Sequence, residues 1–242
     1  MDRSASWIGK VLAHRYRLIA LLGEGSVADV YLARHVLIDR LSAIKLLRAD
    51  AAHSPELRSL FLREARAVNR INHPNIVEIT DYGETPETAY LVMDYVAGEP
   101  MSRVLGRGPL GWRRAAHAGL QLALALSRAH EMGVIHRDLK PSNVLVDARG
   151  GVRILDYGLA AACGTSARGF EGTPAYAAPE QALGEPAREP SDVYALGVIL
   201  FEALADRRPF EGDPQRLLAQ KAQRSAPTLG SLVDGAPEEL CE

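Results

Sequence analysis

The chain has 242 residues, of which 24% are charged and 47% hydrophobic, and its formal net charge is −2. A chain of this length can bury a large core in one or two lobes, and its charge gives no reason to expect nucleic acid or an anionic membrane as a partner. The two cysteines, Cys163 and Cys241, lie far apart in the sequence and imply no disulfide framework.

No secretory signal is recognised at the amino terminus, because the apolar run Leu18–Leu22 is too short for a signal core. The longest later apolar run, Val193–Phe201, has about half the length that a membrane span requires, so it predicts a buried helix. We therefore expect a cytoplasmic protein with no membrane segment in this chain, or the cytosolic domain of a larger or membrane-anchored protein.

Up to about residue 95 the chain reads mostly as short apolar strands. Alternation of apolar and polar residues, or β-branched content, predicts each of them. The strands are expected at Tyr16–Leu22, Ala28–Arg34, Ser42–Leu47, Ile76–Tyr82 and Ala89–Met93.

One helix interrupts these strands, and it is expected to run from Pro55 to Asn72. Ser54 can cap its first turn, which Pro55 suits, and the dipeptide His73-Pro74 ends it. Its apolar face is expected to carry Leu57, Leu60, Glu64, Val68 and Ile71.

After about residue 97 the chain reads as helices and loops. Trp112–Met132 is a long helix, rich in alanine and leucine, that closes at Gly133, and Pro190–Ala205 is a second helix. Because a strand-rich part meets a helix-rich part near Asp94–Gly98, we expect two lobes with a ligand site in the cleft between them.

A short hairpin is expected inside the helical part. The dipeptide Gly150-Gly151 can make its turn between the strands Val144–Val146 and Val152–Leu155.

Residues 136–143 read His-Arg-Asp-Leu-Lys-Pro-Ser-Asn, and they are the most informative stretch of the chain. They place the carboxylate of Asp138, the cation of Lys140 and the amide of Asn143 close together, and Asp156 follows as a second carboxylate. Phosphoryl transfer from a metal-bound nucleotide requires such groups: one that orients the attacking hydroxyl, cations for the moving phosphoryl group, and oxygen ligands for magnesium.

Residues 22–30 read Leu-Gly-Glu-Gly-Ser-Val-Ala-Asp-Val, with glycine at Gly23 and Gly25. Glycines allow backbone amides to approach phosphate oxygens without an intervening side chain. Two spaced glycines on their own are more typical of a plain tight turn, so this motif gains meaning only from the others.

Lys45 ends the Ala-Ile-Lys run of an expected strand, and an isolated lysine there is usually a solvated surface charge. Glu64 changes this interpretation, because it lies on the apolar side of its helix and needs a partner. Lys45 is the candidate partner.

Together these motifs resemble eukaryotic-type protein serine/threonine kinases, and most of all their bacterial group. The run Gly-Thr-Pro-Ala-Tyr-Ala-Ala-Pro-Glu-Gln at 172–181 is similar to that group as well. The matching residues are Gly23, Gly25, Val30, Lys45, Glu64, His136, Arg137, Asp138, Lys140, Asn143, Asp156, Gly158, Pro179, Glu180 and Asp192.

The resemblance implies an α+β, bilobal protein-kinase-like fold. Residues 1–242 would form one protein kinase domain, with a strand-rich N-lobe at about 14–95 that holds one key helix, and a helical C-lobe at about 97–242. Lys140 is similar to the lysine of serine/threonine kinases rather than to the residue that tyrosine kinases usually carry there.

Catalytic roles follow from the resemblance. Asp138 would orient the substrate hydroxyl and accept its proton, and Lys140 would neutralise charge on the transferring phosphate. Asn143 and Asp156 would hold Mg²⁺ through oxygen atoms, as this hard cation prefers. Thr173 would hydrogen-bond Asp138 and Lys140, although a threonine before a proline could also be a simple turn residue.

The resemblance also implies ATP as the nucleotide. Lys45 would bind its α- and β-phosphates and pair with Glu64, and Val68, Ile79, Tyr157 and His136 would stack in one hydrophobic column. The implied nucleotide-binding residues are Leu22, Gly23, Glu24, Gly25, Ser26, Val27, Ala28, Asp29, Val30, Ala43, Lys45, Met93, Asp94, Val96, Leu145 and Asp156.

The chain departs from the family's pattern in three places. Ala28 replaces the third glycine of the loop, and Tyr157 replaces the commoner phenylalanine after Asp156. The chain stops at Glu242, so the C-lobe is expected to lack the last helix and the arginine that usually pairs with Glu180. The chain is then a fragment, or Glu180 has another partner, or the protein is unstable alone.

The expected activity is transfer of the γ-phosphate of Mg-ATP to serine or threonine hydroxyls of protein substrates, in signalling, with autophosphorylation that a dimer would favour. Thr165 and Ser166 are the expected acceptors in the chain, with Arg137 in the pocket that receives the phosphate. The alternative is that Arg137 only braces its loop. Two other functions stay open: a pseudokinase that acts as a nucleotide-sensing scaffold, and a small-molecule phosphotransferase.

Overall fold

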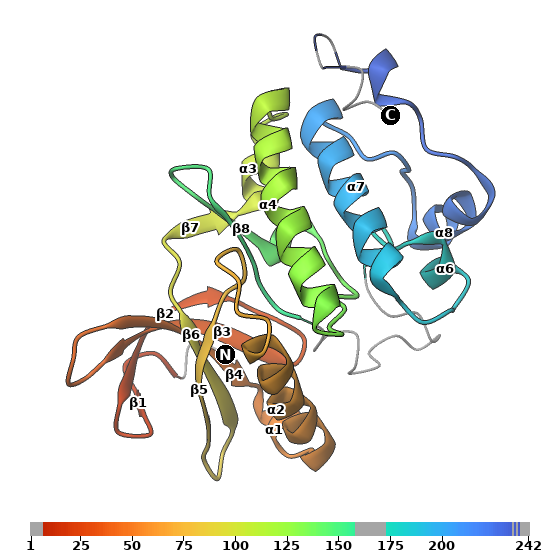
Figure 1. The fold of residues 1–242 in the computed structure, drawn as a ribbon. Coiled ribbons are helices and arrows are strands. Elements are labelled where there is room, and N and C mark those ends of the chain that lie inside the picture. The colour runs from red at the N-terminus through yellow and green to blue at the C-terminus, as the bar shows by residue number, and fades with distance from the viewer. Residues whose placement is uncertain (1–6, 158–172, 234, 236, 238–242) are drawn as a thin grey trace. The chain divides into compact units, whose positions relative to one another are not determined.

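The structure is a computed structural model of the chain, and it describes residues 7–157, 173–233, 235 and 237 (Figure 1). The expectations for Gly158, Cys163, Thr165, Ser166 and Cys241 lie outside these described residues.

The chain divides into two compact units. Unit 1 comprises Met1–Asn72 and Val77–Ala97, and unit 2 comprises His73–Ile76 and Gly98–Glu242. The first is rich in strands and the second in helices, which confirms the predicted α+β class.

Unit 1 is built on a six-stranded antiparallel sheet with the strand order β1-β2-β3-β4-β6-β5 (Figure 1). Two helices, α1 (Ala49–Ala52) and α2 (Pro55–Asn69), connect β4 with β5. The strands are β1 (Val11–Leu12), β2 (Tyr16–Gly23), β3 (Ala28–His35), β4 (Leu41–Leu47), β5 (Ile79–Glu84) and β6 (Ala89–Asp94).

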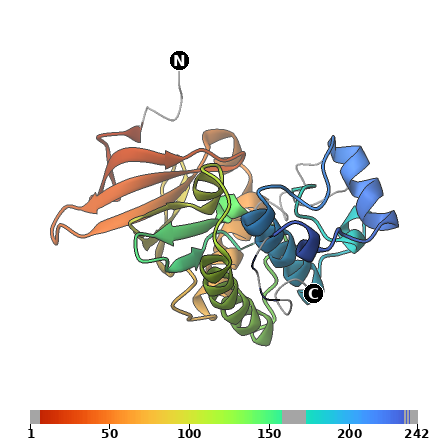
Figure 2. The ribbon, with the colours of Figure 1, turned by 90° about the horizontal axis from the view of Figure 1, so that it is seen from above.

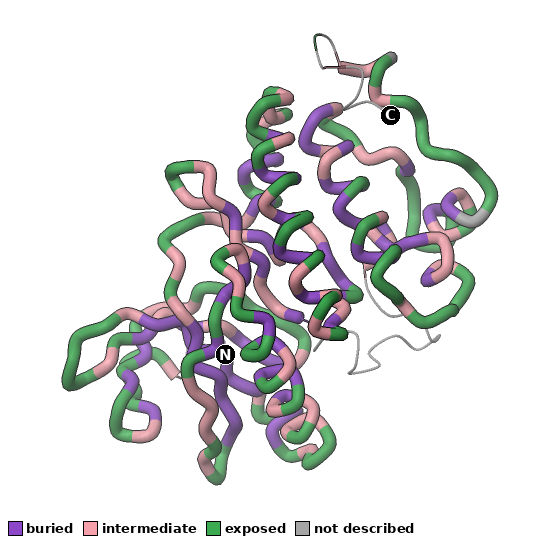
Figure 3. The backbone as a smooth tube through the Cα atoms, viewed as in Figure 1, coloured by how far each residue is buried: buried purple, intermediate pink, exposed green. Residues whose placement is uncertain are grey.

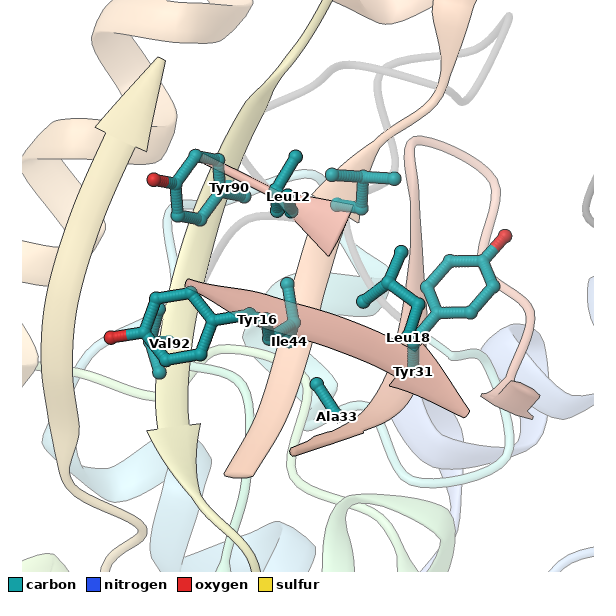
Figure 4. Close-up of a cluster of buried hydrophobic side chains, with 9 residues drawn as sticks. Leu12, Tyr16, Leu18, Tyr31, Ala33, Ile44, Tyr90 and Val92 are labelled. Carbon is teal, nitrogen blue, oxygen red and sulfur yellow. The ribbon is translucent and has the colours of Figure 1, made fainter. Parts of the chain in front are cut away.

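One face of this sheet carries a compact apolar cluster (Figure 4). Ile44 pairs with Tyr31 on one side and with Val92 on the other, and residues directly opposite each other in antiparallel strands share a face. The cluster comprises Leu12, Tyr16, Leu18, Tyr31, Ala33, Ile44, Leu46, Tyr90 and Val92.

The neighbouring positions along the same strands point to the other face, because side chains alternate along a strand. Lys45 lies opposite Val30 there, and Ala43 lies opposite Met93. The register of the sheet therefore brings four of the predicted nucleotide-binding residues to one face.

Helix α2 begins as the sequence predicts. The Oγ atom of Ser54 accepts a hydrogen bond from the Leu57 amide at 3.2 Å, and Pro55 occupies the first turn. The helix ends at Asn69 rather than at Asn72, whose backbone is left-handed with φ of 42°. Its buried residues are Phe61, Glu64, Ala65 and Val68.

The strand expected at Ile76–Tyr82 is shifted along the chain, because β5 begins at Ile79 and ends at Glu84. Ile76 instead forms a parallel bridge with Ile154, and the Ile154 amide donates to the Asn75 carbonyl at 2.8 Å. The apolar character of Ile76 thus belongs to unit 2 and not to the sheet of unit 1.

Unit 2 combines a small sheet of order β7-β8-β9 with several helices (Figure 1). Its strands are β7 (Gly98–Pro100), β8 (Val144–Asp147) and β9 (Val152–Ile154). Its helices are α3 (Met101–Leu105), α4 (Trp112–Glu131), α6 (Pro179–Ala182), α7 (Glu189–Ala205) and α8 (Pro214–Gln223), with the 3₁₀ turns η2 (Pro141–Asn143) and η3 (Leu229–Ser231).

Helices α4 and α7 lie side by side in both ribbon views (Figures 1 and 2). A Cβ atom at Gly119 of α4 would lie 3.0 Å from both Cδ atoms of Leu200 of α7, so the missing side chain allows the close approach. Burial alternates with exposure along α4, as expected for an amphipathic helix with one packed face (Figure 3).

Both predicted turns of unit 2 are confirmed. Gly133, with φ of +69°, closes α4: its amide donates to the His130 carbonyl and the next amide donates to the Ala129 carbonyl. Gly150, with φ of +81°, lies in the hairpin between β8 and β9, where the Asp147 carboxylate accepts hydrogen bonds from two turn amides.

The apolar run Val193–Phe201 lies inside α7, a helix with nine buried residues, as the sequence predicts. Among the residues that the structure describes, no helix is both long enough and apolar enough to cross a membrane.

Candidate active site

The loop before η2 brings together three of the predicted catalytic residues. The Nζ atom of Lys140 donates to Oδ2 of Asp138 at 2.6 Å and to Oγ1 of Thr173 at 2.8 Å. Asp138 is buried, and the lysine keeps a quarter of its side chain exposed. A carboxylate and a cation are thus held side by side in a partly open place, as the resemblance implies.

Asn143 is attached to the same loop. Its Nδ2 atom donates to the Asp138 backbone carbonyl at 3.0 Å, so its amide oxygen is the atom that can serve a ligand. The Asn143 carbonyl accepts a hydrogen bond from the Leu155 amide at 2.8 Å, which places Asp156 beside it. An amide oxygen and a carboxylate are ligands that Mg²⁺ prefers, so this donor set fits the ion.

Two residues of this region have left-handed backbones although neither is glycine. The φ angle is 70° at Arg137 and 49° at Asp156. Such a conformation costs about 1–3 kcal/mol per residue and persists only where the surroundings enforce it. At Arg137 these surroundings are side chains of α6 and α7.

Asp192, in the first turn of α7, holds much of the loop around Arg137. Its two carboxylate oxygens accept hydrogen bonds from the amides of His136 at 2.8 Å and Arg137 at 2.9 Å, and from Nε2 of His130 at 2.8 Å. From α6, Nε2 of Gln181 donates to the Arg137 carbonyl at 3.0 Å. Both peptide groups that flank the strained Arg137 backbone are thus fixed by buried side chains.

Sequence reasoning matched Asp192 to the family but gave it no role, and it did not single out Gln181. A signal for Asp192 was present, because a carboxylate at the start of an apolar helix needs a partner when it is buried. Nothing in the sequence pointed to the target of Gln181.

His136 and Tyr157 lie together, with ring centroids 4.8 Å apart at an angle of 48°. Nε2 of His136 donates to the Leu155 carbonyl at 3.0 Å. Burial raises the pKa of Tyr157, whose hydroxyl has no hydrogen-bond partner among the described residues. Tyr157 differs from the commoner phenylalanine by this hydroxyl group. No contact within the described residues explains the difference.

In unit 1 the predicted ion pair is present. Nζ of Lys45 lies 3.8 Å from Oε1 of Glu64, and both side chains are more than nine-tenths buried. Removing one member of a buried pair leaves the other charge uncompensated, which is costly. The pair joins β4 to α2 on the sheet face that also carries Val30, Ala43 and Met93.

The glycine-rich loop connects β2 with β3. A Cβ atom at Gly25 would lie 2.5 Å from the Ala28 carbonyl oxygen, so only glycine fits there. The Gly25 amide donates to Oδ1 of Asp29 at 3.3 Å, and Asp29 is itself buried. A Cβ atom at Gly23 would meet no atom within 4 Å, so no close contact within the described residues requires glycine at this position.

The remaining predicted nucleotide residues of the loop differ in exposure. Leu22, Glu24 and Ser26 are exposed, whereas Ala28 is buried and Val27 and Val30 are intermediate.

The residues predicted to bind the base lie at the end of β6 and after it. The Asp94 amide donates to the Glu78 carbonyl at 3.1 Å, and the Asp94 carboxylate pairs with Arg40. Val96 follows after β6, and Leu145 lies in β8 of unit 2 opposite Pro100 and Arg153.

The segment from Thr173 to α6 is firmly held within unit 2. The hydroxyl of Tyr176 donates to Oε2 of Glu202 at 2.7 Å. Lys221 of α8, which sequence reasoning missed, donates to three carbonyl groups of this segment. Its spacing from the buried Leu217, four residues earlier on the same helix, was the available signal.

Glu180 has a polar partner within unit 2. Its Oε1 atom accepts a hydrogen bond from the Ser191 hydroxyl, whose oxygen also accepts from the Arg188 amide.

Residues 16–233 match the family described as protein kinase domain, and the chain belongs to that family. This confirms the predicted bilobal kinase fold.

Bacterial relatives are similar over most of the chain. Serine/threonine-protein kinase PrkC of Bacillus subtilis is 40% identical over 239 residues, which cover 96% of this chain and 37% of that protein. Serine/threonine-protein kinase PknA of Mycobacterium tuberculosis is 41% identical over 230 residues, which cover 91% of this chain and 53% of that protein. The kinase pkn3 of Myxococcus xanthus is 39% identical over 221 residues, covering 86% of this chain and 40% of that protein. The predicted resemblance to the bacterial group is confirmed, and the chain spans about half the length, or less, of these relatives.

Proposed function

We propose that this chain transfers the γ-phosphate of ATP to serine and threonine hydroxyls of protein substrates. The observation that carries the proposal is the cluster of Asp138, Lys140 and Thr173, in which one lysine bridges a buried carboxylate and a hydroxyl. The names of the bacterial relatives support serine and threonine as acceptors.

In the proposed reaction the substrate hydroxyl oxygen forms a bond to the γ-phosphorus, the bond from that phosphorus to the β–γ bridging oxygen breaks, and ADP leaves. Asp138 accepts the hydroxyl proton, and Lys140 balances the negative charge on the moving phosphoryl group. Thr173 keeps the lysine directed toward this place, because its Oγ1 accepts one of the ammonium hydrogens.

Asn143 and Asp156 would hold Mg²⁺. The ion, when bound, supplies positive charge to the phosphate oxygens. The hydrogen bond from Asn143 to the Asp138 carbonyl fixes the amide orientation, so one of the two metal-binding residues is tied to the proton-accepting residue.

For the nucleotide we propose the residues of the glycine-rich loop, with Lys45 on the α- and β-phosphates and Glu64 as its partner. The buried ion pair and the absence of space for a side chain at Gly25 support this assignment. Val30, Ala43 and Leu145 would contact adenine, with Met93 behind it and the backbone of Asp94 and Val96 bonded to its edge.

A direct assay tests the function. The protein is incubated with Mg²⁺, γ-labelled ATP and a generic basic protein, and the phosphoamino acids are identified; the expected products are phosphoserine and phosphothreonine. A matched sample with excess chelator is the control. If ATP binds to folded protein but no label is transferred, the proposal is wrong and a nucleotide-sensing scaffold takes its place.

A further inference from the structure

Lys221 of α8 is a buried lysine outside the catalytic cluster, and only 4% of it is exposed. Its Nζ atom donates to three backbone carbonyl oxygens: those of Pro174 at 2.9 Å, Ala175 at 2.8 Å and Ala177 at 2.7 Å. These residues are adjacent in the chain, so one side chain fixes a whole stretch of backbone, 174–177.

The three contacts fit the charged form of lysine only. An ammonium group has three hydrogens to donate and no lone pair, and here each hydrogen has an acceptor. A neutral amine keeps two hydrogens and gains a lone pair, which would face the third carbonyl oxygen. Within the described part of the chain, the hydrogen-bond acceptors of the Lys221 ammonium are thus these three carbonyl oxygens.

The stretch 174–177 follows directly on Thr173, whose hydroxyl accepts from Lys140. Its other contacts are equally specific: Tyr176 is bonded to Glu202, and Ala175 packs with Phe210 and Leu217. The catalytic contact and the Lys221 contacts therefore belong to one continuous segment, and a change in its shape reaches the place where a substrate hydroxyl must arrive.

We propose that Lys221 is a positioning residue, which holds 174–177 in the shape that receives the substrate peptide. This inference rests on the proposed protein kinase function. Lys221 touches neither nucleotide nor reacting atoms in this assignment, so its loss weakens peptide binding more than nucleotide binding.

The surroundings make this contact sensitive to pH. Burial, and secondly the charge of Arg208, lower the pKa of Lys221 to about 7. The other titratable groups nearby are Tyr194, whose ring centroid lies 5.5 Å from Nζ, and Tyr176 and Glu202, which are bonded to each other. Glu180 influences Tyr194 and is itself bonded to the Ser191 hydroxyl.

The sign of the effect separates docking from stability. Lys221 is mostly protonated below its pKa of about 7 and loses its proton as the pH rises through that value, so peptide binding weakens. The pKa is about 7 in the folded chain and 10.5 as the ordinary value, so the unfolded chain binds more protons between them. Lys221 therefore makes the free energy of unfolding rise with pH in that window. A merely structural role would not weaken peptide binding while the free energy of unfolding rises.

The test measures the KM of a serine-containing peptide, the KM of ATP and the free energy of unfolding between pH 6 and pH 9. The proteins are the wild type, Lys221→Met and a control, Arg216→Met, which removes an exposed cation from the same helix. For Lys221→Met at pH 6 we expect the peptide KM to rise at least about tenfold, as for loss of charged hydrogen bonds, while the KM of ATP changes less than about twofold. In the wild type the peptide KM should rise above pH 7, and in Lys221→Met this rise should be absent.

An unchanged peptide KM in Lys221→Met, or equal increases in the KM of peptide and of ATP, overturns the inference and leaves the kinase function standing. Absence of transfer by the wild type overturns the function and the inference together. If Lys221→Met does not fold, the wild-type measurements decide alone: a peptide KM that is flat, or a free energy of unfolding that falls in parallel, overturns the inference.

Discussion

The catalytic loop of unit 2 and the Lys45–Glu64 pair of unit 1 are held in different ways. In the loop, hydrogen bonds of 2.6–3.0 Å fix Asp138, Lys140 and Asn143, and Asp192 holds the backbone before them. In unit 1 the two charges are 3.8 Å apart, which is longer than a hydrogen bond.

The geometry of the loop is fixed within unit 2, whereas the distance between Lys45 and Glu64 can change. The loop carries a strained backbone at Arg137, which Asp192 and Gln181 of the same unit hold in place. The contact in unit 1 depends on where α2 lies against β4, and a small movement of that helix would make or lengthen it. We therefore expect changes in the loop to be more damaging than changes in the pair.

The largest effect is expected at Asp138. In Asp138→Asn the side chain keeps its shape but cannot accept the hydroxyl proton, so kcat should fall by about 10²–10⁴-fold. Steady-state phosphorylation of a protein substrate measures it, with a thermal unfolding curve to show that the variant is folded. Turnover at the wild-type rate would show that Asp138 is not the proton acceptor.

Next comes the brace at Asp192. Asn has one acceptor oxygen, so Asp192→Asn cannot serve the amides of His136 and Arg137 and the His130 ring together. We expect a loss of about 3 kcal/mol in the free energy of unfolding and a fall in kcat of roughly tenfold or more. Urea unfolding and the kinase assay measure these. Asp206→Asn, at the exposed C-terminal end of the same helix, is the control and should match the wild type.

A smaller effect is expected for the pair in unit 1. Lys45→Met and Glu64→Gln should each lower kcat/KM by about one order of magnitude, and the double variant should lose little more, because the two residues act as a unit. A double-mutant cycle on kcat/KM measures the coupling. Fully additive losses would mean that the ion pair is not functional.

The smallest effect is expected from the segment outside the described residues. Autophosphorylation at Thr165 or Ser166 should raise activity, because a phosphate brings a charge of about −1.5 to −2 that suits an arginine such as Arg137. Mass mapping after incubation with Mg-ATP identifies the sites. If a Thr165→Ala/Ser166→Ala variant is as active as the wild type, Arg137 serves only to brace its loop.

The parts of the site that lie close together in the sequence could be predicted. Asp138, Lys140 and Asn143 occupy one loop, so their spacing alone fixes what they can reach. The cap at Ser54 and the turn at Gly133 are also local, because each depends on a few neighbouring residues. These features needed no knowledge of distant contacts.

The supporting contacts could not be predicted, because they join residues far apart in the chain. Asp192 reaches amides more than fifty positions earlier, and Lys221 reaches carbonyls more than forty positions earlier. Backbone amides and carbonyls carry no mark in the sequence of whether they are to be bound. The late start of the strand expected from Ile76 has a similar cause, since Ile76 pairs with Ile154 and β5 begins at Ile79.

The affinities of Asp138→Asn, Asp156→Asn and the wild type for Mg-ATP test directly whether Asp138 acts on the hydroxyl and Asp156 holds the metal. Calorimetric titration, with and without Mg²⁺, separates a residue that acts on the hydroxyl from one that holds the metal. We predict that Asp138→Asn binds within about threefold of the wild type, that Asp156→Asn binds at least about tenfold more weakly, and that this gap closes when Mg²⁺ is removed. Equal affinities for Mg-ATP in all three proteins would contradict the assignment of Asp156 to the metal and of the loop to phosphoryl transfer.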